Sequence, residues 1–147
     1  MLEIMRDSRI GAHGAAGVTL LLVAKVAALS GVLAQPRGAA LLLFPGAARC
    51  AVVPCVAWFR YARDTGLGAP FRQARPANVA GAALIFGLVA ASVDAARALP
   101  AAAVALVIAL ALSTWVGRRL GGLTGDVYGA AIELAEIAFL TAWLALG

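Results

Sequence analysis

Charged residues are scarce in this sequence of 147 residues. They make up 13% of it, whereas a typical soluble domain has about 25%. Hydrophobic residues make up 63%, against about 45–50% in soluble domains. This composition excludes an ordinary soluble domain and predicts an integral membrane protein. The length allows one compact bundle of helices and leaves no room for a second domain.

Cysteine and histidine are nearly absent. The two cysteines, Cys50 and Cys55, are five residues apart, which matches no metal-binding or redox spacing and predicts two buried thiols. The only histidine, His13, has no partner spacing and is weak evidence for a metal ligand or a catalytic base. Nothing in the sequence resembles a nucleic-acid-binding module. The net charge of +5 therefore suggests membrane topology first and an anionic ligand second.

Five long apolar stretches are present, and they run roughly over residues 14–34, 39–59, 78–96, 99–117 and 126–146. A helix that crosses a bilayer needs about 20 residues, and none of these stretches alternates with the period of a β-strand. The sequence predicts an all-α fold, a polytopic transmembrane bundle of about five spanning helices. Asp94, Arg97 and Pro100 crowd the connection between the third and fourth stretches, which predicts a tight helical hairpin there.

Arginines are unevenly distributed over the connecting segments. The predicted helices alternate in direction, so two sets of segments lie on opposite sides of the membrane, and one set holds only Arg37 and Arg97. The other set holds eight: Arg6, Arg9, Arg60, Arg63, Arg72, Arg75, Arg118 and Arg119. The positive-inside rule then predicts a cytoplasmic N-terminus and an external C-terminus. The same topology brings three polar, glycine-containing segments to the cytoplasmic face, where they could hold a phosphorylated substrate and a metal ion.

Acidic and basic residues also occur deep inside the apolar stretches. Glu133 and Glu136 lie about 10 and 15 Å along the last helix, where an acidic side chain costs about 2.5–3.5 kcal/mol. Lys25 and Arg49 are similarly deep and are the natural counter-charges. Either the acids serve a function, or pairs such as Lys25–Glu136 and Arg49–Glu133 only satisfy one another. Asp126 lies seven residues before Glu133, on nearly the same helical face.

Two glycine-containing segments flank these helices. In "GGLTGD" (121–126), glycines allow close approach of the backbone to a ligand, and Thr124 or Asp126 could cap the following helix. The free N–H groups of that helix would then face an anion, although a plain capped turn explains the spacing equally well. "RDSRIGAHG" (6–14) is by itself typical of a capped helix entry.

Three stretches resemble the cobalamin synthase family, the adenosylcobinamide-GDP ribazoletransferases. They are "EIMRDSRIGAHG" (3–14) with the apolar "LLVAKVAAL" that follows, "ARDTGLGAPF" (62–71) and "RRLGGLTGDVYGAAIELAE" (118–136). The stretches occur in the family's order and spacing, they extend over the whole chain, and the last is quite specific.

The resemblance implies a membrane enzyme of the last steps of cobalamin assembly, in the bacterial inner membrane. It would join α-ribazole or its 5′-phosphate to adenosylcobinamide-GDP and release GMP, with Mg²⁺ as cofactor. The motif positions carried over are Asp7, Ser8, Gly11, Gly14, Arg49, Gly122, Thr124, Gly125, Asp126 and Glu133. Asp126 is the expected metal ligand and, with Glu133, the expected catalytic pair. Arg9, Arg118 and Arg119 are expected to hold diphosphate oxygens.

The sequence departs from the family in one respect. Family members have a further upstream portion with an acidic motif of the type D-G-x-x-D-x-x-D-G, and this chain corresponds to the part that follows it. We therefore expect a C-terminal part of a longer enzyme, which needs an upstream polypeptide or another copy and is inactive alone. A small transporter with polar groups at mid-depth and a membrane scaffold subunit are the alternative functions.

Overall fold

The computed structural model describes residues 11–35, 38–62 and 75–147. These residues form five helices, α1 (Ala12–Leu33), α2 (Ala39–Trp58), α3 (Pro76–Val93), α4 (Ala95–Leu120) and α5 (Gly125–Ala145). Each helix is long and apolar enough to cross a membrane. Within the described ranges the fold is therefore the predicted all-α transmembrane bundle.

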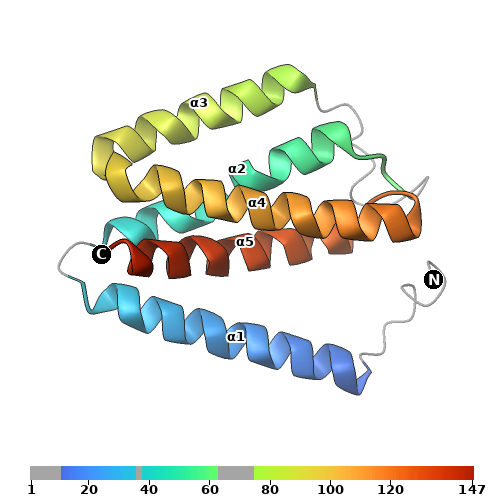
Figure 1. Cartoon of the computed structure of the whole chain (residues 1–147), viewed down its shortest axis with the longest axis horizontal. Coiled ribbons are helices and arrows are strands. Elements are labelled where there is room, and N and C mark those ends of the chain that lie inside the picture. The colour runs from blue at the N-terminus through green and yellow to red at the C-terminus, as the bar shows by residue number, and fades with distance from the viewer. Residues whose placement is uncertain (1–10, 36–37, 63–74) are drawn as a thin grey trace.

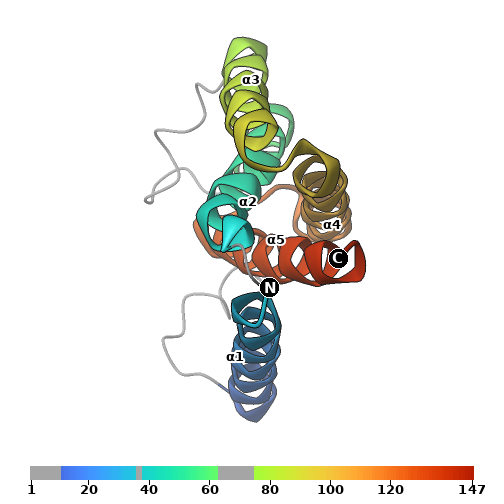
Figure 2. The same ribbon diagram turned by 90° about the vertical axis from the view of Figure 1, so that its left-hand side faces the viewer.

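Four of the helices form a row, and the fifth covers one side of it. Seen along the bundle in Figure 2, the order in the row is α3, α2, α5 and α1, while α4 packs beside α2, α5 and α3. Successive helices run in opposite directions, so that α1 begins at one end of the bundle and α5 ends at the other (Figure 1). The starts of α1, α3 and α5 and the ends of α2 and α4 share one end, which we call the loop end.

The core lies where α2, α4 and α5 meet, and it consists largely of alanine. On α4 the buried residues recur every three or four positions: Ala98, Ala101, Ala105, Ala109 and Ser113. Small side chains allow helix backbones to approach closely in a membrane, where no hydrophobic force drives helices together. Larger side chains, Phe139, Leu140 and Trp143 of α5, fill the core toward the end opposite the loop end. The core therefore fixes the position of α5 relative to α2 and α4.

The connection between α3 and α4 is the predicted tight hairpin, reduced to one residue. Asp94 has φ −163° and ψ 84°, and its carboxylate accepts a hydrogen bond from the backbone N–H of Arg97 at 3.3 Å. Arg97 and Pro100, which the sequence placed around the turn, lie inside α4. Asp94 starts α4 early because its side chain satisfies one of the backbone donors that a helix start leaves free.

The fourth helix also continues three residues beyond its predicted end. It runs to Leu120 and so carries Arg118 and Arg119 on its last turn, instead of in the following loop. Cationic side chains are favourable at the C-terminal end of a helix because the backbone dipoles leave negative charge there. Gly121, with φ 73°, then ends the helix in the left-handed conformation that glycine adopts without strain.

The first helix packs only by its second half. Residues 11–20 are all exposed, whereas Ala28 and Val32 are buried, and α1 contacts mainly α5. In Figure 1 the first half of α1 diverges from the rest of the bundle toward the loop end.

Candidate functional site

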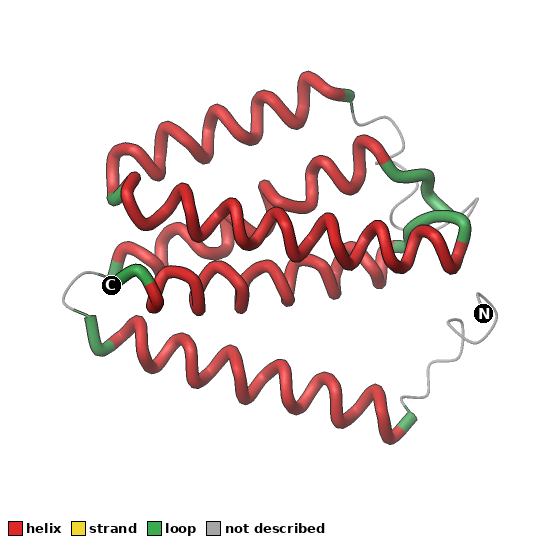
Figure 3. The backbone as a smooth tube through the Cα atoms, in the orientation of Figure 1, coloured by secondary structure: helices red, strands yellow, loops and turns green. Residues whose placement is uncertain are grey.

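Two chain segments are hydrogen-bonded to each other at the loop end. The segment after α2 and the loop between α4 and α5 form a short parallel bridge between Tyr61 and Leu123. The backbone N–H of Ala62 donates to the carbonyl of Leu123 at 2.7 Å, and the N–H of Leu123 donates to the carbonyl of Arg60 at 2.8 Å. Figure 3 shows the two segments side by side in green. The glycine-containing loop is thus held by backbone bonds to a distant part of the chain.

Gly122 makes this approach possible. A Cβ atom at this position would lie 2.6 Å from the carbonyl oxygen of Arg60 and 3.0 Å from the nitrogen of Ala62. No side chain fits at these distances, so the glycine is required by the packing of the loop against residues 60–62. The sequence predicted a close approach of this backbone to a ligand, whereas the structure shows the protein backbone of Arg60 and Ala62 as the neighbour of Gly122.

Beneath the bridge lies a small buried layer of aromatic and apolar side chains. The rings of Tyr61 and Tyr128 stack with centroids 6.3 Å apart, and the side chain of Leu123 is fully buried. Neither tyrosine is among the site residues predicted from the sequence. Their pairing escaped prediction because they are 67 residues apart and no periodic pattern links them. The layer fixes the first turn of α5 against the end of α2.

Thr124 occupies the N-cap position of α5, as the sequence allowed. Its backbone is extended (φ −120°, ψ 167°), and its carbonyl accepts the N–H of Tyr128 at 3.1 Å. The side chain, however, makes no capping hydrogen bond. The hydroxyl is completely buried and has no hydrogen-bond partner among the residues that the structure describes. Such a group is unusual, because buried polar atoms are nearly always paired.

Charged residues stand on the helix turns directly before and after this loop. Asp126 lies exposed in the first turn of α5, where a carboxylate is favoured by the helix dipole. Arg118 and Arg119 lie exposed in the last turn of α4, and the guanidinium of Arg119 is 4.5 Å from the centroid of the Trp115 ring. One carboxylate, two arginines and the backbone N–H groups at the start of α5 thus lie on the two helix turns that the glycine-containing loop connects. This combination suits a phosphorylated ligand.

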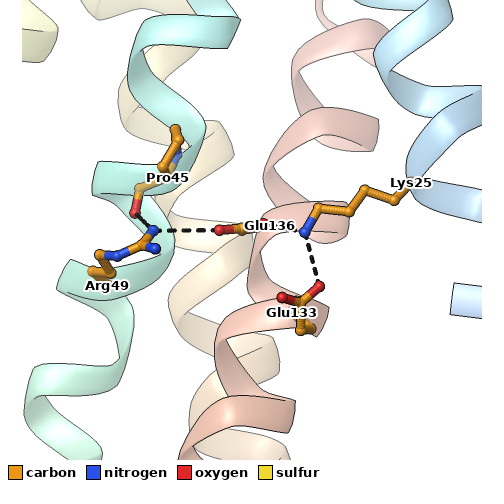
Figure 4. A network of polar contacts seen from close by, with 5 residues as sticks. All are labelled: Lys25, Pro45, Arg49, Glu133 and Glu136. Atoms are coloured by element: carbon orange, nitrogen blue, oxygen red, sulfur yellow. Dashed lines mark hydrogen bonds and ion pairs between the residues drawn. The ribbon is translucent and has the colours of Figure 1, made fainter. Parts of the chain in front are cut away.

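A second polar group lies within the helices. Lys25 of α1 is ion-paired with Glu136 of α5 and contacts the carboxylate of Glu133 at 2.8 Å. A terminal guanidinium nitrogen of Arg49 on α2 is 3.4 Å from the carboxylate of Glu136 and donates to the carbonyl of Pro45 at 2.9 Å. In Figure 4 these side chains form a row from α2 across α5 to α1. We call Lys25, Arg49, Glu133 and Glu136 the charge cluster.

The cluster bears out one of the two ion pairs that the sequence suggested and replaces the other. Lys25 pairs with Glu136 as predicted, but Arg49 also contacts Glu136, and not Glu133. The carboxylate of Glu136 is 7% exposed and lies between two cations, which identifies it as a structural link among three helices. Glu133 lies about 10 Å further along α5 than Asp126, and its carboxylate contacts Lys25. A catalytic role of Glu133 beside Asp126 stays a prediction.

Of the remaining predicted site residues, Gly125 begins α5 and is exposed, and the others belong to the first segment of the chain. Gly11 and Gly14 lie at the start of α1, where both are exposed, and a Cβ atom at Gly11 would have no neighbour within 4 Å. Asp7, Ser8 and Arg9 lie outside the described residues. The predicted role of this segment beside the loop of α4 and α5 stays a prediction.

The described residues contain no group of three or more histidine, cysteine or acidic residues that could enclose a metal ion. Asp126 is the acidic residue in the first turn of α5. Mg²⁺ is commonly held by one or two carboxylates together with substrate phosphates and water. Asp126 fits a site of that kind.

Both cysteines are free thiols; Cys55 is buried as predicted, while Cys50 is only partly buried.

The fold and the polar loop end define a polytopic α-helical membrane protein with a candidate phosphate-binding site at one end. A family model described as cobalamin-5-phosphate synthase matches residues 1–144, and the chain belongs to this family. The resemblance found in the sequence is thereby confirmed.

Known relatives extend beyond the length of this chain. A Roseiflexus protein is 41% identical over 95% of the chain and 52% of its own length, and a Citrobacter koseri protein is 41% identical over 98% and 60%. Both are named adenosylcobinamide-GDP ribazoletransferase. The chain thus spans between half and two thirds of these relatives. No solved structure matches it.

Proposed function

We propose that this chain forms part of a membrane transferase that joins α-ribazole or its 5′-phosphate to adenosylcobinamide-GDP and releases GMP. Family membership and the names of the relatives support the reaction. The observation that supports the proposal is the loop of residues 121–124, which backbone bonds hold against residues 60–62. Arg118 and Arg119 directly precede this loop on α4, and Asp126 follows it in the first turn of α5. Such an arrangement is suited to binding a diphosphate at a fixed place.

In the proposed reaction a hydroxyl oxygen of α-ribazole attacks the phosphorus atom that is bonded to cobinamide. The bond from this phosphorus to the bridging oxygen breaks, GMP leaves with the electron pair, and the hydroxyl proton passes to a base. Phosphoryl transfer relies mainly on positioning and on neutralising charge at the phosphate oxygens. Arg118 and Arg119 can neutralise that charge, and the N–H groups at the start of α5 can orient the diphosphate.

Asp126 would hold Mg²⁺ together with substrate phosphates. Mg²⁺ would supply charge neutralisation at the leaving group when bound. Thr124 is the other candidate for a direct role, because its buried hydroxyl lacks a partner among the described residues and lies directly before the start of α5. Glu133 would support Asp126 from deeper on the same helix.

The orientation in the membrane is part of the same proposal. Eight of the ten arginines outside the predicted spans lie on the side of the loop end, which favours the cytoplasmic side for that end. The bacterial inner membrane is the proposed location. A corrinoid substrate would then lie against the cytoplasmic rim of the bundle, with its diphosphate at the loop of residues 121–124.

The experiment uses a host that lacks its own ribazoletransferase. In this host the chain is co-expressed with the part of the Citrobacter koseri relative that lies outside the match. Membranes receive adenosylcobinamide-GDP with α-ribazole or with its 5′-phosphate, and both GMP and the corrinoid product are measured. We expect equal amounts of the two products. The intact relative serves as positive control. If the relative turns over and the combined chains release no GMP in any of several such combinations, the proposed function is wrong.

A further inference from the structure

One face of the helix row carries charge but is covered by no described helix. Helix α4 packs on one side of α2 and α3. On the opposite side, α2 and α3 form a groove with a cavity of about 320 Å³, whose wall includes Leu42, Gly46, Arg49, Ile85 and Val89. The groove is otherwise apolar. We call this side of α2 and α3 the Arg49 face.

Arg49 lies at mid-depth on this face and is largely open. It is ten residues from the start of α2, or about 15 Å, and its side chain is 63% exposed. A guanidinium group has five N–H donors, and the described residues offer Arg49 two acceptors, one each from Glu136 and Pro45. Glu133, in the same charge cluster, is 44% exposed.

Lipid is a poor covering for such a face. A charged side chain at mid-depth is costly in hydrocarbon and almost always faces protein or a water-filled cavity. Arg49 cannot easily reach the membrane surface, because both ends of α2 are far away and its guanidinium is held by Glu136 and Pro45. The exposed N–H donors of Arg49 therefore indicate that protein covers this face. The two cations and two carboxylates of the cluster already balance, so the covering group need not carry a charge.

We propose that the Arg49 face is covered by a membrane-spanning helix from the part of the family's length that this chain does not span. The two relatives have 48% and 40% of their length outside the match, which is ample for further helices. The helix would lie in the groove between α2 and α3 and offer an uncharged oxygen, from a hydroxyl or an amide, to Arg49. The proposal rests on family membership and does not depend on the proposed reaction.

Site-specific photo-cross-linking tests this proposal. Benzoylphenylalanine replaces either Ile85 or Val107 in the full chain, which is expressed with the unmatched part of the Citrobacter koseri relative. Ile85 lines the groove and is 67% exposed, whereas Val107, the matched control, is 62% exposed on α4 and lies away from the buried alanines of that helix. Both positions lie near the middle of their helices. We expect an adduct with the added polypeptide at Ile85 and several-fold less at Val107.

A second measurement gives an interpretable result even if the added polypeptide does not associate with this chain. The intact relative carries benzoylphenylalanine at its residue aligned with Ile85, and the cross-linked peptide is identified by mass spectrometry. A peptide from the unmatched part supports the proposal. Adducts with lipid alone, or with a second copy of the matched region, overturn it. Cross-linking needs no turnover, so a failure of the proposed function would be seen separately.

Substitution of Arg49 gives a further outcome in the same membranes. Arg49→Leu removes the donors that the covering helix would satisfy, while Lys25 still neutralises Glu136. We expect several-fold less added polypeptide to be recovered with the chain, and a smaller Ile85 adduct. Unchanged recovery and an unchanged adduct would show that Arg49 does not hold the covering helix.

Discussion

The bridge between residues 60–62 and the loop of residues 121–124 can be tested by adding one methyl group. In Gly122→Ala the new Cβ would lie 2.6 Å from the carbonyl oxygen of Arg60, while ordinary contacts begin at 3.4 Å, so the two segments must separate by about 0.8 Å. The hydrogen bonds of 2.7 and 2.8 Å beside this contact would then lengthen to about 3.5 Å or more, too long for a sound hydrogen bond. Two such bonds contribute about 1–3 kcal/mol in total.

The assay is thermal unfolding of the purified protein in detergent, with membrane yield as a second readout. A loss of this size lowers the midpoint by roughly 2–12 °C in a protein of about 150 residues. The matched control is Gly129→Ala on α5, where a Cβ atom meets nothing within 4 Å and alanine favours the helix. The control should unfold at the same or a higher temperature. Equal midpoints for Gly122→Ala and the unaltered protein would refute the close approach described here.

Three further predictions concern the charge cluster, the cap of α5 and the topology. Glu136→Gln should lower membrane yield more than Glu133→Gln, because Glu136 pairs with two cations and Glu133 with one. The turnover of Glu136→Gln per folded molecule should stay within several-fold of that of the unaltered protein. A larger loss of yield in Glu133→Gln would contradict the structural role of Glu136. Thr124→Val should leave thermal stability unchanged or raise it, since the Thr124 hydroxyl has no partner among the described residues. A lower unfolding midpoint would reveal a hydrogen bond of this hydroxyl. A fall in turnover at an unchanged midpoint would indicate that the hydroxyl contacts the substrate. A reporter fused after Gly147 should report the external side and one inserted near Gly68 the cytoplasm; one compartment for both would exclude five spans.

The helices were predictable because the apolar stretches are long and their polar interruptions are few. Their observed bounds differ from the predicted ones by at most four residues, and the largest difference is in α4. There Asp94 begins the helix early and Gly121 ends it late. Both effects are local and depend on side-chain capping and left-handed backbone, which hydropathy does not measure.

The pairing of Lys25 with Glu136 was predictable from depth alone, because a mid-depth charge needs a partner at the same level. Depth could not decide which carboxylate Arg49 contacts, since that depends on how α2 and α5 are rotated. The backbone bridge between Tyr61 and Leu123 could not be predicted from the sequence either, because it joins segments 62 residues apart through backbone atoms. Hydrophobic periodicity carries no information about such contacts.

We propose Asp126 as the residue that organises the diphosphate and its metal ion beside the loop of residues 121–124. The most direct measurement compares turnover of Asp126→Asn with that of the unaltered protein, in the combined system described above, over a range of Mg²⁺ concentrations. The substitution keeps the shape of the side chain and removes its charge, and Gly129→Ala on the same helix is the control. Turnover should fall at least about a hundredfold, as expected for the loss of one electrostatic contact in such a site, with normal membrane yield. Near-normal turnover of Asp126→Asn at limiting Mg²⁺ would contradict this role and show that the carboxylate has no part in the chemistry.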